Sequence, residues 1–213
     1  MKSHQTQDKE KIKPVYGIGI NDSGYVVSRY ETVDGKQKGV WICPFYRAWK
    51  HMLERCYSKR LHKIRSSYVG CEVCLEWQRF SVFRRWMKSQ DWQGKQLDKD
   101  ILVLGNKVYS PAACIFVSRQ LNNFLTNSLR ARGDFQIGVS WNNRTGKFIS
   151  HCKNPFAGKL EGLGYFSTED AAHEAWRRRK HELAYQHASL QKDARLADAL
   201  RSRFAIDDSV RAA

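Results

Sequence analysis

The chain has 213 residues and a formal net charge of +16, from 37 Lys and Arg against 21 Asp and Glu. Its hydrophobic content of 42% is enough for the cores of one or two domains. No segment reaches the roughly 18 apolar residues of a membrane span, and the start, MKSHQTQDKEKIK, lacks the apolar run of a signal peptide. We therefore expect a soluble, cytoplasmic protein. So basic a chain favours a nucleic-acid partner over a membrane, because no segment pairs a basic face with a wide apolar one.

The cysteines do not predict a disulfide framework, because the chain shows no secretion signal. Cys71 and Cys74 are the only pair at metal-ligand spacing. A zinc site would need two further ligands, for which Cys56 and Cys114 are the candidates. Small buried thiols are the favoured interpretation.

The first half of the chain alternates between strand and helix patterns. Residues 1–13 are polar and without periodicity, which predicts a disordered basic tail. Residues 15–42 are strand-like, with turn signals at 21–24 and at Asp34-Gly35. Pro44 opens a helix to about residue 58, with an apolar stripe at helical spacing: Phe45, Trp49, Met52, Leu53 and Cys56.

A basic loop at 59–65 is expected next, and then a second amphipathic helix from about 75 to 90. The inner side of that helix is aromatic: Trp77, Phe80, Phe83, Trp86 and Met87. At helical spacing such residues form a core rather than a base-stacking surface. A further helix ends the segment 93–126, and residues 126–135 lose their periodicity, which predicts an interdomain linker.

Residues 97–117, LDKDILVLGNKVYSPAACIFV, combine an acidic strand end, a Gly-Asn turn and Tyr-Ser-Pro before a helix-like segment. This order resembles the ββα-metal finger of the HNH (His-Me finger) nucleases, in the form common in phage homing-endonuclease-like proteins. The resemblance extends over about 45–125. It implies an Asp-His pair whose His is the general base, and a helix Asn or His that helps hold one metal. Here Asp98 takes the Asp position, Lys99 replaces the His, and Ala113 replaces the helix ligand.

Phosphodiester hydrolysis needs a base, a metal and charge neutralisation at the leaving oxygen. Asp98 and Asp100 would share a strand face and could hold Mg²⁺ or Mn²⁺, while Asn106 could orient a group across the turn. Lys99 could bind a phosphate, but it could act as a base only if burial strongly lowered its pKa. The alternative is that both carboxylates are turn and strand-end groups and the finger is structural.

The segments 136–142, 146–153 and 159–166 predict three short strands. Ser167 and Asp170 have capping-box spacing, which predicts a helix from 168 to at least 186. Residues 187–213 would extend that helix or fray.

This region resembles the Apetala/ethylene-response-factor DNA-binding domain through Gly138-Val139, Gly146–Phe148, Leu163–Phe166 and Thr168–Ala172. The resemblance implies a three-stranded sheet in the major groove with the helix behind it. The matching contact positions are Ser140, Trp141, Asn143, Arg144, Lys147, His151 and Lys153, with Lys159 nearby on the third strand. Ser140 and His151 replace an Arg and a Glu of plant members, so no target sequence transfers.

We therefore expect an α+β protein with a degenerate ββα-metal finger between flanking helices and a three-stranded antiparallel sheet packed on one helix. The expected parts are a tail (1–13), an HNH-like domain (14–127), an Apetala-like domain (136–190) and a helical or frayed end (191–213). Two hypotheses remain for a double-stranded DNA-binding protein in the cytoplasm of a phage-infected bacterium, a context that rests on resemblance. One is a metal-dependent nickase or endonuclease of homing type that uses Asp98. The other is a catalytically inactive DNA-binding regulator or structural protein on the same scaffold.

Overall fold

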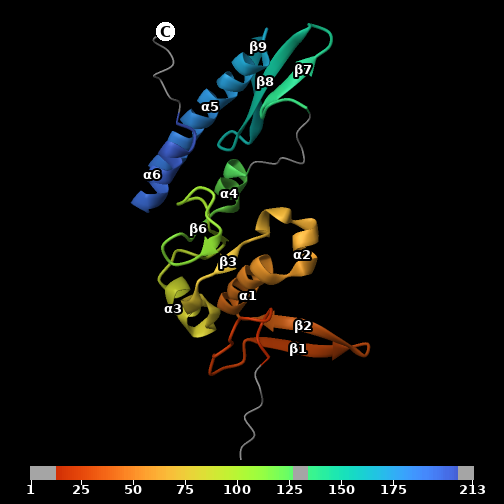
Figure 1. Cartoon of the computed structure of the whole chain (residues 1–213), viewed down its shortest axis with the longest axis vertical. Coiled ribbons are helices and arrows are strands. Elements are labelled where there is room, and N and C mark those ends of the chain that lie inside the picture. The colour runs from red at the N-terminus through yellow and green to blue at the C-terminus, as the bar shows by residue number, and fades with distance from the viewer. Residues whose placement is uncertain (1–12, 127–133, 206–213) are drawn as a thin grey trace, which may run out of the picture. The chain divides into compact units, whose positions relative to one another are not determined.

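The computed structural model describes residues 13–126 and 134–205, and its chain forms two units (Figure 1). Unit 1 takes in the residues up to 93 together with 105–116, and unit 2 takes in 94–104 and the residues from 117 on. The mixture of helices and small sheets is α+β, as predicted. The predicted tail and linker fall mainly on 1–12 and 127–133, which lie outside the described residues.

Unit 1 begins with a two-stranded antiparallel ribbon of β1 (Ser28–Val33) and β2 (Lys36–Ile42). The predicted turn signal is confirmed, because Asp34 and Gly35 connect the strands with positive φ angles of 51° and 71°. Between its ends the ribbon is exposed on both faces, and a bulge at Arg29 and Tyr30 shifts its register.

The first predicted helix is confirmed as α1 (Pro44–Tyr57), which begins with proline and buries Trp49, Met52, Leu53 and Cys56. Trp49 donates a hydrogen bond from its indole nitrogen to the Trp77 carbonyl (2.6 Å). The expectation of a loop at 59–65 is wrong, since these residues form α2 (Lys59–Ile64). The Ser58 hydroxyl accepts a hydrogen bond from the Leu61 amide and so caps this short helix.

The second predicted helix is divided into a 3₁₀ turn (Leu75–Gln78) and α3 (Phe80–Lys88). Arg79 between them is extended, because Ile20 forms a strand-like bridge there. The Ile20 amide donates to the Gln78 carbonyl (2.8 Å), and the Phe80 amide donates to the Ile20 carbonyl (3.0 Å). The aromatic side chains predicted to face inward do form the core of this unit, and Trp77, Phe80 and Phe83 have no exposed surface.

The finger-like segment, and the stretch before α3 that pairs with it, contain short elements instead of a regular hairpin. A 3₁₀ turn (Ser66–Tyr68) leads to β3 (Glu72–Val73), which pairs in parallel with β5 (Val108–Tyr109). β4 (Gln96–Asp98) precedes an irregular stretch, and β6 (Ile115–Val117) leads into α4 (Arg119–Leu125). Pro111 begins a turn rather than a helix. A ββα-metal finger is therefore not confirmed.

Unit 2 contains the three predicted strands as an antiparallel sheet of β7 (Val139–Asn142), β8 (Lys147–Asn154) and β9 (Lys159–Phe166). The long helix α5 (Glu169–Ser189) packs against all three strands (Figure 1). Its cap is Thr168, whose hydroxyl accepts from the Ala171 amide, so the predicted capping box at Ser167 is wrong by one residue. After α5 the chain forms a separate helix, α6 (Ala194–Arg203), which contacts α5.

Candidate nucleic-acid interface

The face of the β7–β8–β9 sheet opposite α5 is the candidate interface. Along β8, Ser150, Cys152 and Asn154 are buried, and they point to the helix side. Glu161, which pairs with Cys152 in the register, accepts a charged hydrogen bond of 2.8 Å from Arg179 of α5 and confirms that direction. Because neighbouring residues of a strand alternate between faces, the intervening residues of β8 lie on the other face: Lys147, Ile149, His151 and Lys153.

Cross-strand pairing extends this open face to the outer strands. Ser140 of β7 and Tyr165 of β9 both pair with Ile149, and Leu160 pairs with Lys153. Tyr165 and Leu160 are 54% and 62% exposed. The sequence analysis did not predict these two residues as contacts. Tyr165 could have been found, because it and Phe166 are neighbours in a predicted strand and must face opposite sides of the sheet.

The hairpin turn between β7 and β8 presents two further predicted residues, Asn143 and Arg144. The Asn142 side chain fixes the turn, since its oxygen accepts from the amides of Arg144 (2.9 Å) and Thr145 (3.2 Å). Asn143 and Arg144 are exposed. The turn therefore presents a guanidinium next to the open face.

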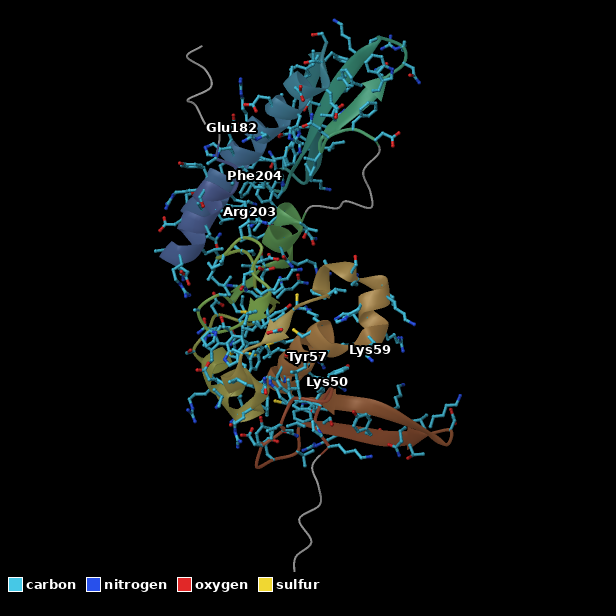
Figure 2. The ribbon with its side chains drawn as sticks, in the orientation of Figure 1. Lys50, Tyr57, Lys59, Glu182, Arg203 and Phe204 are labelled. Carbon is cyan, nitrogen blue, oxygen red and sulfur yellow. The ribbon has the colours of Figure 1, made fainter. Side chains whose placement is uncertain are left out.

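Charges are divided between the two sides of this sheet. On the helix side, the Arg179 guanidinium pairs with Glu161 of β9 at 2.8 Å and with Glu182 of α5 at 2.6 Å. Glu182 is labelled in Figure 2. Arg177 and Arg178 both pair with Glu174 on the same helix. On the open face and its hairpin, by contrast, Arg144, Lys147 and Lys153 form no ion pair within the described residues.

Six of the nine predicted DNA contacts thus come together, and three do not. Ser140, Lys147, His151 and Lys153 lie on the open face, with Asn143 and Arg144 in the hairpin. Trp141 pairs with Phe148 on the helix side, where the two rings meet edge to face at 4.8 Å. Lys159 shares that side with Asn154.

Lys99 is the remaining predicted contact, and it is buried, with 6% of its surface exposed. Its ammonium pairs with the Asp100 carboxylate at 3.1 Å. This placement offers little of the ammonium to a phosphate.

The carboxylate of Asp98, a predicted catalytic residue, is bound by backbone amides. One of its oxygens accepts hydrogen bonds from the amides of Asp100 (2.8 Å) and Ile101 (2.9 Å). Burial, reinforced by the negative charge of Asp100, raises the pKa of Asp98 above its usual range. Asp100 lies beyond the end of β4, so the two carboxylates do not share a strand face as expected. This geometry is that of a carboxylate that stabilises a turn.

Asn106, the third predicted catalytic residue, also binds its own loop. Its amide nitrogen donates to the Val108 carbonyl (2.7 Å), and its oxygen accepts from the Val108 amide (3.2 Å). Of the predicted zinc ligands, Cys71 is buried and Cys74 is half-buried, and both thiols are free. Within residues 13–126 and 134–205, no three His, Cys, Asp or Glu side chains are grouped so that they could hold a metal ion. The Mg²⁺, Mn²⁺ and zinc sites stay predictions.

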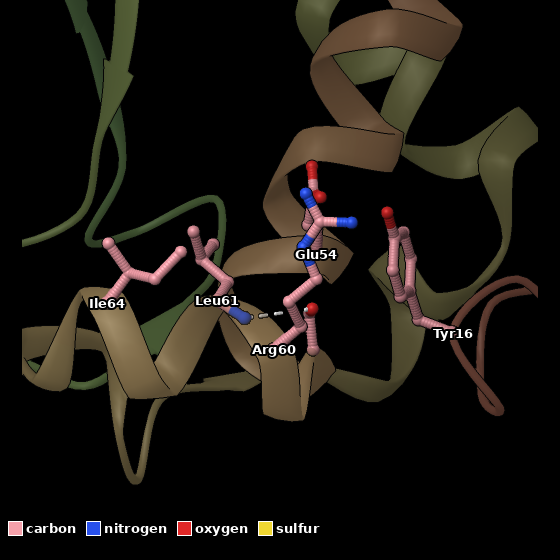
Figure 3. A pocket seen from close by; sticks show the side chains of 6 residues that line it. Tyr16, Glu54, Arg60, Leu61 and Ile64 are labelled. Atoms are coloured by element: carbon pink, nitrogen blue, oxygen red, sulfur yellow. Dashed lines mark hydrogen bonds between the residues drawn. The ribbon is translucent and has the colours of Figure 1, made fainter.

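Unit 1 has a small cavity of about 360 Å³ between α1, α2 and Tyr16 (Figure 3). Glu54, Arg60, Leu61 and Ile64 are among its lining residues. Burial raises the pKa of Tyr16, and the charge and hydrogen bond of Glu54 raise it further. A cavity with a carboxylate and a phenol in contact is a poor site for a phosphate.

Comparison with protein-family models, with curated proteins and with solved structures gives no match to this chain. No helix in the described part of the chain is both long and apolar enough to cross a bilayer. The geometry and charge of the sheet are therefore the features that bear on function.

Proposed function

We propose that the protein binds double-stranded DNA through the open face of β7–β8–β9 and the β7–β8 hairpin. The main support for this proposal is the difference in charge pairing between the helix side and the open face of the sheet. Glu161, Glu174 and Glu182 pair with arginines on the helix side. Arg144, Lys147 and Lys153 form no ion pair among the described residues and can neutralise a partner's charge. Together with a net charge of +16, this arrangement suits a polyanion.

The chemistry of the face supports duplex DNA as the polyanion. Lysine and arginine side chains neutralise phosphates, while Ser140, Asn143 and His151 can donate to or accept from base edges. Tyr165 and Ile149 add apolar surface of the kind that contacts a thymine methyl group. A sheet supported by a helix would hold these groups in fixed positions, which limits the entropy lost on binding.

The test is an equilibrium titration of the full chain with labelled duplex DNA at several salt concentrations. Arg144→Ala and Lys147→Ala should each weaken binding about fivefold or more and lower the salt dependence by about one unit. Lys159→Ala is the matched control, because it removes an exposed lysine from the other side of the same sheet. Equal effects of all three substitutions, with folding unchanged, would reject this face as the interface.

The geometry favours the non-catalytic form of the proposal. Asp98 accepts two backbone hydrogen bonds, Lys99 stands in the place of the general base, and Asn106 bonds to Val108. A nicking assay on supercoiled DNA with Mg²⁺ or Mn²⁺ tests this view. Nicking that disappears in Asp98→Asn, a variant that keeps the size and the acceptor oxygen of the side chain, would restore the nuclease hypothesis.

A further inference from the structure

A second cavity, of about 480 Å³, lies within unit 2 between α4, the β8–β9 turn and α5. Apolar side chains of Phe124, Ile137 and Trp176 line it, and so do two lysines, Lys153 and Lys180. The remaining lining residues are uncharged, and no Asp or Glu is among them. Its volume lies within the range of pockets that hold small organic ligands.

Lys180 is the chemically unusual residue of this cavity. Its ammonium donates to the Phe124 carbonyl (2.5 Å) and lies 3.6 Å from the centre of the Phe124 ring. The rings of Phe204, labelled in Figure 2, and Trp176 are 5.2 and 5.7 Å away. In the described part of the chain no carboxylate pairs with this ammonium. Burial lowers the pKa of Lys180 to about 8.

The hydrogen bond from Lys180 to Phe124 has a structural explanation, but the contacts with the aromatic rings do not neutralise the ammonium. The bond to the Phe124 carbonyl satisfies an acceptor in the last turn of α4. An ammonium has three donors, and aromatic rings compensate its charge only in part. A half-buried cation without a counter-ion costs free energy that an anion in the adjoining cavity would recover in part.

We propose that this cavity binds a small organic anion, namely a carboxylate carried by a planar apolar ring. The carboxylate pairs with Lys180 and Lys153, and the ring packs on the wall formed by Phe124 and Ile137. A DNA phosphate shares the anionic group but would leave that apolar wall unused, which favours the small molecule. This site shares Lys153 with the open face, but its central residue, Lys180, belongs to α5, so its test does not depend on the DNA-binding proposal.

Ligand titration of the full chain tests the site, with 4-fluorobenzoate as the probe and ¹⁹F NMR as the readout. The neutral 4-fluorobenzamide, of the same shape, is the control ligand. We expect a dissociation constant of about 1 mM for the benzoate, a usual strength for a ligand of this size, and binding at least about tenfold weaker for the amide. Benzoate affinity should fall as the pH rises through about 8, because Lys180 then loses its charge.

Lys180→Met keeps the apolar stem and removes the charge, and it should abolish the preference for benzoate over benzamide. Lys159→Met is the matched control and should keep that preference. If Lys180→Met does not fold, a measurement on the unaltered protein still tests the site. In the unaltered protein, benzoate should slow the acetylation of Lys180 at pH 7, mapped by mass spectrometry, and should leave the acetylation of Lys159 unchanged.

Equal affinity for the two ligands, or no protection of Lys180 by benzoate, would overturn the proposal. Protection of Lys180 by duplex DNA without protection by benzoate would also overturn it and would assign the cavity to the DNA interface. Loss of DNA binding in Arg144→Ala would leave the result at Lys180 unchanged, so the two proposals can fail separately.

Discussion

Replacement of Gly138 by alanine tests how closely the start of β7 packs on α5. Gly138 has a φ of +84°, and a Cβ atom at this position would overlap the Cδ1 and Cγ atoms of Trp176 and lie 2.8 Å from its Nε1 atom. Trp176 has little room to move, because it is 8% exposed and its ring stacks on His173 at 5.4 Å.

The expected loss of stability has two parts. A side chain in the left-handed region costs about 1 kcal/mol relative to glycine, and overpacking of a core adds about 1–3 kcal/mol. Gly138→Ala should therefore destabilise unit 2 by about 2–4 kcal/mol, a large share of the about 5–15 kcal/mol of a typical domain. Gly146→Ala is the matched control, since Gly146 has a φ of +61° but no atom within 4 Å of the place that a Cβ would take. It should lose only the backbone part.

Hydrogen exchange of β7–β9 peptides, measured by mass spectrometry in the full chain, reports the opening free energy of this sheet by itself. We expect Gly138→Ala to lower that free energy by at least about 1 kcal/mol more than Gly146→Ala does. Equal losses in the two variants, within about 0.5 kcal/mol, would refute the claim that the contact between Gly138 and Trp176 restricts the position of the sheet.

Two further predictions concern ionisable groups. Burial, with the charge of Lys180 nearby, lowers the pKa of His187, so stability that is present above about pH 6.5 is lost as the pH falls towards the lower folded pKa. Urea midpoints at pH 7.5 and 5.5 should show this loss in the unaltered protein and a smaller one in His187→Phe, and an undiminished loss would contradict the assignment. Burial works to raise the pKa of Asp22, but hydrogen bonds from Ser81 outweigh it and hold that pKa below its usual value. Asp22→Ala should cost about 1 kcal/mol at pH 7, and its destabilising effect should disappear as the pH falls through the folded pKa, as thermal unfolding of both proteins would show.

Sequence patterns predicted the elements whose burial follows their own periodicity. The stripe around Trp49 predicted α1, and the strand predicted over 146–153 is β8, along which Ser150, Cys152 and Asn154 alternate with less buried residues. The pattern of α1 is strong because large apolar side chains recur at the period of the helix. The residues of the open face follow from the alternation along β8. Trp141 was expected on that face because of the resemblance, although its pairing with Phe148 places it on the helix side.

The elements that sequence patterns missed depend on single hydrogen bonds or on distant segments. α2 is basic and buries no residue, so only the bond between Ser58 and Leu61 indicates where it starts. The interruption at Arg79 comes from Ile20, almost sixty residues earlier in the chain. The direction of the Asp98 side chain is set by two backbone amides, which no residue pattern displays.

The exposed ribbon of β1 and β2 has a consequence for self-association. A two-stranded hairpin without a covering layer is marginally stable, and its outer amides and carbonyls can pair with a strand of another molecule. Lys36 and Lys38 of β2 and the bulge at Arg29 oppose such pairing through charge and irregular geometry. Salt screens exposed charges but leaves apolar contacts intact. Concentrated protein at high ionic strength should therefore associate first through this ribbon.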